Sequence, residues 1–473
     1  MTELIWRGAR ELTRAIRTRE LSCHDLMSAC YDQIERLNPD VNAIVNLLPR
    51  ASALQQATRK DEALARGDEI GVLNGLPMAV KDLQAVQGFP TTFGFVPYAD
   101  QVADQDGELA ARMRRAGAII IGKTNVPEFG LGSNTFNSLF GATHNPYALH
   151  KTAGGSSGGA AAALATGMLP VADGSDMGGS LRNPASFCNV VGLRPSMGRV
   201  PDERGLGWSA RLSVCGPMAR TVADTAMLLA AQAGHYPPDP LSLAESGDGF
   251  VAPLERKAAG LKLAISPTLG GLPVDREVEQ RITVAGETFT ELGATVEEAC
   301  PDLTGAMDVF QVQRAANLAV LGRELETRLP NWREHTKDAA IWNIEKGLAL
   351  TAQELIQADL ERTKIYRRVV RFFHNYDALL CPAAQVPPFD IEDEWVREIN
   401  DQTLTTYIDW MTVCCAISVT ALPAISVPGG FTDAGLPVGL QIVGRPRGDF
   451  ELLQIGYLFE QATKHYQTKP AIV

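Results

Sequence analysis

Two glycine-bordered serine loops are the segments of this chain best suited to chemistry. The first, Gly154–Gly159, reads Gly-Gly-Ser-Ser-Gly-Gly, and the second, Gly174–Ser180, reads Gly-Ser-Asp-Met-Gly-Gly-Ser. A catalytic hydroxyl needs an exposed oxygen and nearby backbone N–H donors, and glycine leaves room for both because it has no side chain. The pattern therefore favours nucleophilic catalysis by serine.

Three other interpretations of the loops are open. A Gly/Ser run is often a flexible linker, but here it leads into an Ala-rich helix expected over 160–165 and then into a second loop of similar composition. The loops could also bind phosphate, but neither has a usual phosphate-binding motif: neither matches G-x-x-x-x-G-K-[ST], and neither has G-x-G-x-x-G after a strand. Residues 154–158 do fit G-x-S-x-G, the nucleophile elbow of α/β-hydrolases, but the segment before them, 145–150, is a poor strand candidate.

The elements that must position the loops are short. The Ala-rich helix over 160–165 and a buried strand expected over 169–172 lie between the two loops and bring them together. Upstream, the apolar run 78–80 predicts another buried strand, with Lys81 at its end. Asp82 follows, and because neighbours on a strand point to opposite faces, its carboxylate should face away from Lys81.

Helices and strands alternate along the rest of the chain. This alternation predicts an α/β fold with helices on both faces of a sheet. A region from 303 to 373 is expected to be mostly helical, with a break at Pro330. Helices are expected over 22–37, 51–66, 108–116, 222–233, 276–292 and 450–463, and strands over 118–121, 261–265, 378–380 and 438–443; the Asn38-Pro39 pair is expected to end the helix over 22–37.

Composition excludes several classes of function. The 473 residues are 45% hydrophobic, which is ample for a large core, and the net charge of −12 argues against nucleic acid or an anionic membrane surface as the main partner. No secretory leader or membrane-length apolar run is visible, so a cytoplasmic location is expected. The eight cysteines form no C-x-x-C pair and are expected to be reduced thiols rather than metal ligands.

The serine loops, together with Gly75–Asp82, Leu422–Pro428 and Gly435–Gln441, resemble the signature of the amidase signature family, the Ser-Ser-Lys amide hydrolases. The resemblance implies an α/β fold with a large mixed, mostly parallel twisted sheet covered by helices on both faces. It also implies one domain over 1–473. Its parts would be an N-terminal helical cover (1–70), a catalytic signature core (71–235) and a variable helical substrate-pocket region (300–376).

Residue by residue, the resemblance implies a triad of Lys81, Ser156 and Ser180. Ser180 would be the nucleophile, Ser156 the bridging serine and Lys81 the base, with a cis peptide bond joining Gly155 to Ser156. A lysine base is physically demanding, because its ordinary pKa of about 10.4 must fall toward the working pH. Burial without an acidic partner lowers that pKa.

The second loop would supply the remaining parts of the site. The backbone N–H groups of Met177, Gly178 and Gly179, with that of the serine that follows them, would form the oxyanion hole. Asp176 and Arg182 would pair to hold the shape of the loop. No metal or organic cofactor is implied.

The implied reaction is acyl transfer to the serine from a small-molecule amide, ester or carbamate, followed by hydrolysis. Two other functions stay open: the glutaminase subunit of a tRNA-dependent amidotransferase, and a catalytically silent binding scaffold. Substrate identity and oligomeric state, a homodimer included, are also open. The resemblance is weakest from about residue 235 to 420, where members of the family usually differ, and four aromatic residues of that stretch could wall the pocket or merely pack: Trp332, Trp342, Tyr407 and Trp410.

Overall fold

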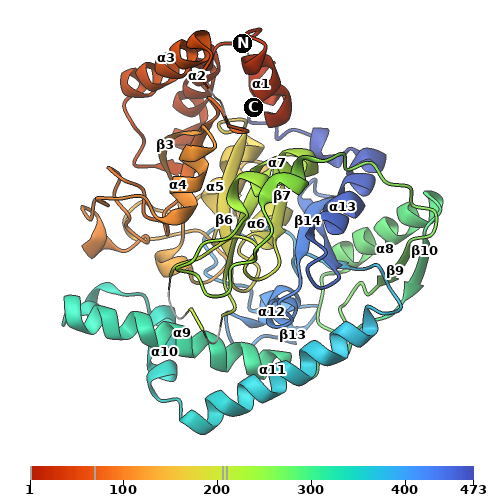
Figure 1. The fold of residues 1–473 in the computed structure, drawn as a ribbon. Coiled ribbons are helices and arrows are strands. Elements are labelled where there is room, and N and C mark those ends of the chain that lie inside the picture. Colours follow the sequence, from red (N-terminus) through yellow and green to blue (C-terminus); the bar gives the residue numbers. More distant parts are fainter. Residues whose placement is uncertain (1–2, 69–70, 205–206, 209–210) are drawn as a thin grey trace.

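An eight-stranded mixed sheet runs through the centre of the computed structural model, which describes residues 3–68, 71–204, 207–208 and 211–473 (Figure 1). Within the described residues, the order across the sheet is β10-β9-β11-β15-β14-β7-β8-β6. In that order the strands are β10 (Thr295–Glu298), β9 (Lys262–Ile265), β11 (Ala378–Pro382), β15 (Pro437–Gly444), β14 (Ala424–Phe431), β7 (Val191–Arg194), β8 (Val214–Ala219) and β6 (Val171–Asp176).

The direction of pairing changes along this sheet. The first two pairs in this order, β10 with β9 and β9 with β11, are parallel. Every later pair, from β11 with β15 to β8 with β6, is antiparallel. The sheet is mixed, as expected, but it contains more antiparallel pairs than the resemblance implies. One reason is local, because only residues 432–436 separate β14 from β15, and so short a connection returns the chain as a hairpin.

Alternate residues of the strands enter two different hydrophobic clusters. On β11, Ala378 and Leu380 share a cluster with residues of α8 (Arg276–Glu291) and α13 (Asp449–Thr463). Leu379 and Cys381 share the other cluster with residues of α9 (Ala306–Arg328), α11 (Ala352–Phe372) and α12 (Thr412–Val419). This alternation is what the period of a strand requires when both faces are buried. Helices therefore cover both faces, as the sequence predicts.

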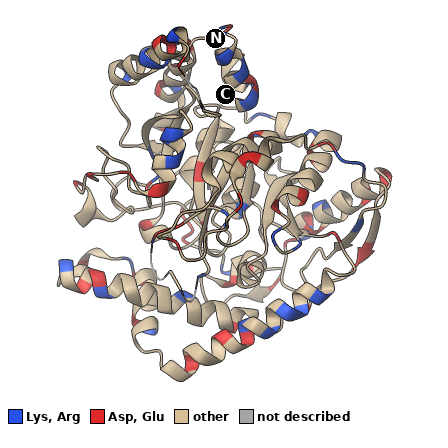
Figure 2. Ribbon diagram, in the orientation of Figure 1, with Lys and Arg blue, Asp and Glu red and all other residues tan. Residues whose placement is uncertain are grey.

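The predicted helical region after residue 303 forms a layer beside this sheet. It consists of α9 (Ala306–Arg328), α10 (Asp338–Leu348) and α11 (Ala352–Phe372), followed later in the chain by α12 (Thr412–Val419). The break expected at Pro330 lies between α9 and the short helix η5 (Trp332–His335). Figure 2 shows acidic residues in the first half of α11 and basic residues in its second half, an arrangement that the helix dipole favours.

A separate three-stranded sheet carries the lysine segment. β2 (Pro77–Lys81) pairs parallel with β3 (Ile119–Thr124), which pairs antiparallel with β1 (Ile44–Val45). The N-terminal helices α1 (Ala9–Arg17), α2 (Cys23–Val41) and α3 (Arg50–Arg66) lie at the same end of the molecule, red in Figure 1. Whether residues 1–70, 71–235 and 300–376 are the natural subdivisions of one domain stays a prediction.

The second helix differs from its prediction at one end. It begins after Ser22, whose side chain accepts the N–H of Asp25, but it continues through Pro39 to Val41. The expected stop at Asn38-Pro39 was wrong: Pro39 stands in the last turn, so its missing N–H removes one intrahelical hydrogen bond, the one to the Glu35 carbonyl, and the helix continues for two more residues. The helix ends instead at Asn42, which takes a left-handed conformation.

The loops lie among shorter elements of the described chain. The strand expected over 169–172 starts at Val171 and continues to Asp176, so it reaches the second serine loop directly. The segment before the first loop does form a strand, β5 (Ala148–Thr152), but β5 pairs with β4 (His144–Asn145) and through one bridge with Asp390, and it lies outside the central sheet that a nucleophile elbow requires. Three helices complete this part: α5 (Gly158–Ala165), α6 (Arg182–Phe187) and α7 (Val222–Gln232).

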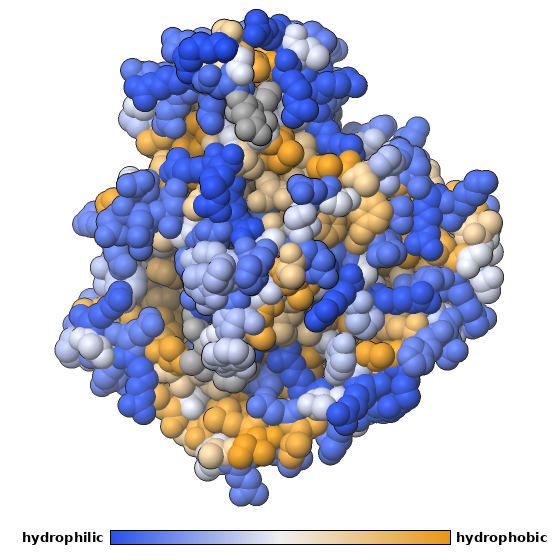
Figure 3. Space-filling view, viewed as in Figure 1, coloured by the Kyte–Doolittle hydropathy of each residue, from blue (hydrophilic) through white to orange (hydrophobic). Residues whose placement is uncertain are grey.

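The face of the molecule seen in Figure 3 is mostly polar, and one group of apolar side chains on it lies at the turn between α10 and α11. Leu348, Ile356 and Leu360 are exposed there. Among the residues described, no helix has both the length and the apolar character to cross a bilayer.

Candidate active site

Lys81 ends strand β2 with its side chain fully buried. Its amine nitrogen donates to the Oγ of Ser156 at 2.8 Å, to the Oγ of Ser157 at 2.8 Å and to the backbone oxygen of Ser175 at 3.3 Å. The two serines belong to the first loop, and Ser175 belongs to the second. One amine therefore holds both loops together.

Burial lowers the pKa of Lys81 to about 7. The nearby carboxyl of Asp173 acts in the opposite direction, but it accepts the backbone N–H of Lys81 at 3.1 Å rather than its amine, and burial raises its own pKa to about 6. A lysine with a pKa near 7 is unprotonated to a large extent at neutral pH. The amine can therefore accept a proton, which an ordinary lysine cannot do under these conditions.

Asp82 faces away from Lys81, as the strand geometry predicts. Its carboxylate accepts the hydroxyl and the backbone N–H of Thr92 and lies 3.4 Å from the amine of Lys123. Lys123 comes from the neighbouring strand β3 and is also fully buried. The negative charge next in sequence to Lys81 is thus directed at a different lysine.

The first loop is held in shape by polar contacts from outside it. The peptide bond between Gly155 and Ser156 is cis, as the resemblance implies. The Gly155 oxygen accepts the hydroxyl of Ser133 at 2.8 Å, and the Gly154 oxygen accepts the hydroxyl of Thr135 at 2.7 Å. A Cβ on Gly155 would lie 2.8 Å from the Thr135 Oγ1, so the close approach of these segments requires glycine.

Ser180 stands between β6 and α6, with 8% of its surface exposed. It lines the same cavity as Ser156, and within the described chain no hydrogen bond engages its hydroxyl. Its backbone oxygen accepts the N–H of Ser157 at 3.2 Å, which joins the second loop to the first. The structure thus brings Lys81, Ser156 and Ser180 to one place.

Asp176 and Arg182 form a fully buried ion pair beneath the second loop, with 2.8 Å between Oδ1 and Nη2. The Asp176 carboxylate also accepts the N–H groups of Gly179 at 2.9 Å and Leu181 at 3.2 Å. Burial alone would raise the pKa of Asp176, but the guanidinium groups of Arg182 and Arg194 outweigh burial and hold that pKa well below its usual range. The loop that carries the predicted nucleophile is therefore shaped around a permanently charged carboxylate.

This arrangement changes the expected oxyanion hole. The N–H of Gly179 is engaged by Asp176, so it does not face an oxyanion as the resemblance implies. Met177 and Gly178 line the cavity together with Ser180. A Cβ on Gly178 would lie 2.8 Å from the Phe310 ring and 2.9 Å from the Cys415 sulfur, so this segment also requires glycine.

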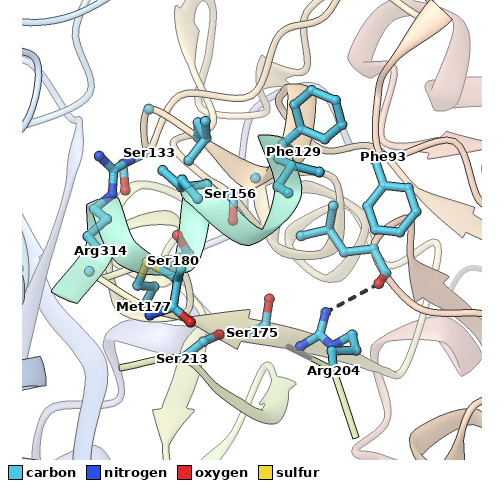
Figure 4. A pocket seen from close by; sticks show the side chains of 18 of the residues that line it. Phe93, Phe129, Ser133, Ser156, Ser175, Met177, Ser180, Arg204, Ser213 and Arg314 are labelled. Carbon is cyan, nitrogen blue, oxygen red and sulfur yellow. Dashed lines mark hydrogen bonds between the residues drawn. The ribbon is translucent and has the colours of Figure 1, made fainter. Parts of the chain in front are cut away.

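The cavity has a volume of about 260 Å³ and is lined by hydroxyl, apolar and charged side chains (Figure 4). Its serines are Ser133, Ser156, Ser175, Ser180 and Ser213. Its large apolar residues are Leu83, Phe93, Phe129, Leu131, Met177, Phe310, Leu318, Leu321 and Met411. The charged residues among those described are Asp202, Arg204 and Arg314. Such a mixture suits a small, partly apolar organic molecule.

The Amidase family model matches residues 25–453. The chain belongs to the amidase signature family. An acylamidase of Rhodococcus erythropolis is 36% identical, with 100% of this chain and 99% of that protein covered. A glutamyl-tRNA(Gln) amidotransferase subunit of Thermosynechococcus vestitus is 33% identical over 98% of this chain and 99% of its own. The crystal structure of a bacterial aryl acylamidase of the amidase signature enzymes superposes with a TM-score of 0.91 at 29% identity, covering 98% of each chain.

The protein is an amidase, an enzyme that hydrolyses amides. Many residues of its site lie outside the sequence prediction, among them Ser157, Ser175 and Arg314. Ser157 had a visible signal, since it sits beside Ser156 in a symmetrical glycine-bordered run. Arg314 had none, because α9 brings it to the cavity from a distant part of the chain.

The aromatic residues singled out in the variable region do not wall the described part of this amidase's cavity. Trp332 and Trp410 are fully buried in hydrophobic clusters. Tyr407 packs its ring against Arg314, with 5.2 Å between the guanidinium carbon and the ring centre, and Trp342 packs edge-on against Tyr407. The packing alternative therefore holds for these side chains.

Proposed function

We propose that this amidase cleaves small-molecule amides through an acyl-enzyme on Ser180. The Ser180 oxygen attacks the amide carbon while its proton passes to Ser156, and Ser156 passes its own proton to the amine of Lys81. The C–N bond then breaks as the proton returns by the same route to the leaving nitrogen. A water molecule repeats the sequence on the acyl-enzyme and releases the acid.

One observation supports this mechanism above all others: a fully buried lysine amine lies 2.8 Å from Ser156 in the cavity into which Ser180 opens. Burial gives the base the pKa that it needs. The N–H groups of Met177, Gly178 and Ser180 are the candidate donors to the oxyanion. In other serine enzymes, removal of one such donor costs about 2.7–4 kcal/mol of transition-state stabilisation.

We infer that the preferred substrates include acylated aromatic amines. Phe93, Phe129 and Phe310 line the cavity beside the reacting serines. The likeness to an acylamidase and to an aryl acylamidase agrees with this chemistry. Esters and carbamates present the same carbonyl carbon to Ser180 and belong to the proposed range.

The amidotransferase likeness makes glutamine the competing substrate. The α-ammonium group of glutamine needs a carboxylate, and Asp202 is the only acidic residue among the described residues that line the cavity. Both oxygens of Asp202 already accept from Arg204, each at 2.8 Å. This arrangement favours an independent amide hydrolase over a glutaminase. A silent scaffold is disfavoured because the lysine and both serines are present together.

The test compares para-nitroacetanilide, phenyl acetate and glutamine as substrates for the purified chain and for Ser180→Ala and Lys81→Met. We expect the unmodified chain to release para-nitroaniline and both variants to lose essentially all turnover. A fluorophosphonate probe should label the unmodified chain and leave Ser180→Ala unlabelled. Release of ammonia from glutamine without anilide hydrolysis, or full activity in either variant, would overturn the proposal.

A homodimer and a cytoplasmic location stay predictions. Light scattering after size-exclusion chromatography, at several protein concentrations, distinguishes a monomer from a dimer. Fractionation of cells that produce the full chain tests the location.

A further inference from the structure

Arg314 is a buried cation at the edge of the catalytic cavity, where α9 presents it near Ser133 and Ser180 in the view of Figure 4. Only 4% of its surface is exposed. In the part of the chain that the structure describes, no carboxylate forms an ion pair with it. Arg204, the other arginine of the cavity, differs because Asp202 neutralises it.

Neutral groups hold Arg314 in place. Its Nη1 donates to the Oδ1 of Asn343 at 2.6 Å, and its guanidinium lies over the ring of Tyr407. Asn343 is itself fixed, because its amide group donates to the Ala339 oxygen at 2.6 Å and to the Tyr407 hydroxyl at 2.5 Å. The guanidinium is therefore oriented before any ligand arrives, and one of its five N–H donors is already given to Asn343.

A buried guanidinium without an acidic partner is unfavourable unless an anion completes it. The surrounding cavity does not supply that anion, since its described acid, Asp202, is already paired with Arg204. The chain as a whole does not attract anions, because its net charge is −12, so the position of Arg314 in the cavity is not part of a generally basic surface. The positive charge is thus local, and it lies in the cavity that holds the reacting serines.

We propose that Arg314 binds a carboxylate of the substrate, so that this amidase favours amides carrying a carboxylate a few bonds from the scissile C–N bond. A guanidinium matches the planar shape of a carboxylate and binds it through two parallel hydrogen bonds. The inference rests on the proposed amide hydrolysis and adds its substrate class. The carboxylate stands on either the acyl or the amine part of the substrate, and the experiment separates the two.

The first measurement uses matched substrates and the unmodified enzyme. On the acyl side, the para-nitroanilide of succinic acid is compared with that of isohexanoic acid, which replaces the carboxylate with a methyl-branched group. On the amine side, N-acetyl-meta-aminobenzoate is compared with N-acetyl-meta-aminobenzamide. One carboxylate substrate should exceed its neutral partner by about 10- to 100-fold in kcat/KM, mainly through KM. Equal or lower values for both carboxylate substrates would overturn the proposal.

The second measurement asks whether Arg314 causes the preference. Arg314→Gln should reduce the ratio between the carboxylate substrate and its neutral partner at least tenfold, and Arg314→Lys should fall between the two. Arg323→Gln is the matched control, because Arg323 lies on the same helix with its side chain exposed. An unchanged ratio in Arg314→Gln would assign the arginine to packing against Tyr407 alone.

Binding separates this inference from the proposed function. If no amide is hydrolysed at all, the proposed function fails, and calorimetry with the same succinic and isohexanoic anilides still tests the carboxylate site. Tighter binding of the succinic compound, at least tenfold and lost in Arg314→Gln, would support the site without catalysis. If Arg314→Gln does not fold, the preference of the unmodified enzyme decides the question.

Discussion

The amine nitrogen of Lys81 lies 2.8 Å from the Ser157 hydroxyl oxygen, as close as it lies to the bridging serine. Ser157 is fully buried next to the N-terminus of α5, and a Cβ on Gly174 would approach its Oγ to 2.7 Å. The lysine is therefore held by a second hydroxyl that is not among the described residues lining the cavity. We assign Ser157 the role of positioning the base while Ser156 exchanges protons with it.

Ser157→Ala should lower kcat by about tenfold, because the loss of one buried hydrogen bond of about 1–2 kcal/mol leaves the amine less well placed. Ser156→Ala removes the proton relay itself and should lower kcat by about a hundredfold or more. Steady-state hydrolysis of para-nitroacetanilide measures both. The pH profile of Ser157→Ala should also move, since the hydroxyl contacts the base. Equal losses in the two variants would contradict the separate roles.

Activity should rise with pH through neutrality. Burial lowers the pKa of Lys81 to about 7, so below that pH the amine carries a proton and cannot accept another. The logarithm of kcat/KM should increase by about one per pH unit on the acidic side and level off above about pH 8. Stopped assays over pH 5 to 9 with a neutral anilide measure this. A rate that falls over the same range would rule out a lysine base.

The lowered pKa of Lys81 also makes the stability of the fold depend on pH. The folded pKa of about 7 lies below the ordinary lysine value of 10.5, so between these two values the unfolded chain binds more protons than the folded chain. This group therefore makes the protein more stable as pH rises through that window. We expect the free energy of unfolding, measured by urea titration, to increase more between pH 7 and 9 in the unmodified protein than in Lys81→Met. A constant difference between the two proteins would show that the lysine is not shifted.

Asp176→Asn should destabilise the fold strongly. The substitution leaves the guanidinium groups of Arg182 and Arg194 buried without their carboxylate, a loss of about 3–5 kcal/mol. Asp32→Asn is the matched control, because its ion pair with Arg50 is partly exposed and should contribute less than about 1 kcal/mol. Urea unfolding compares the two variants. Similar small effects would mean that the second loop does not depend on its buried ion pair.

Local sequence determined much of the scaffold. The apolar run before Lys81 forms the buried strand expected of it, and the left-handed Gly67 ends α3. The glycine-bordered loops were visible as catalytic candidates because glycine beside serine leaves the hydroxyl and the neighbouring backbone N–H groups accessible. Strand alternation also directed Asp82 away from Lys81. These features depend on preferences of a few neighbouring residues, which a sequence displays directly.

Tertiary structure decided the rest of the site. Packing joined β2 to two loops that begin more than 70 residues later, selected Ser157 as a second partner of the lysine, and turned the Gly179 N–H toward Asp176. It also brought Arg314 from α9 to the same cavity and left it without a described acidic partner. Contacts between residues so far apart in the chain follow from how the sheets and helices bury their apolar faces. No stretch of sequence carries that information alone, so the chemistry was foreseeable while its supporting residues and substrate charge were not.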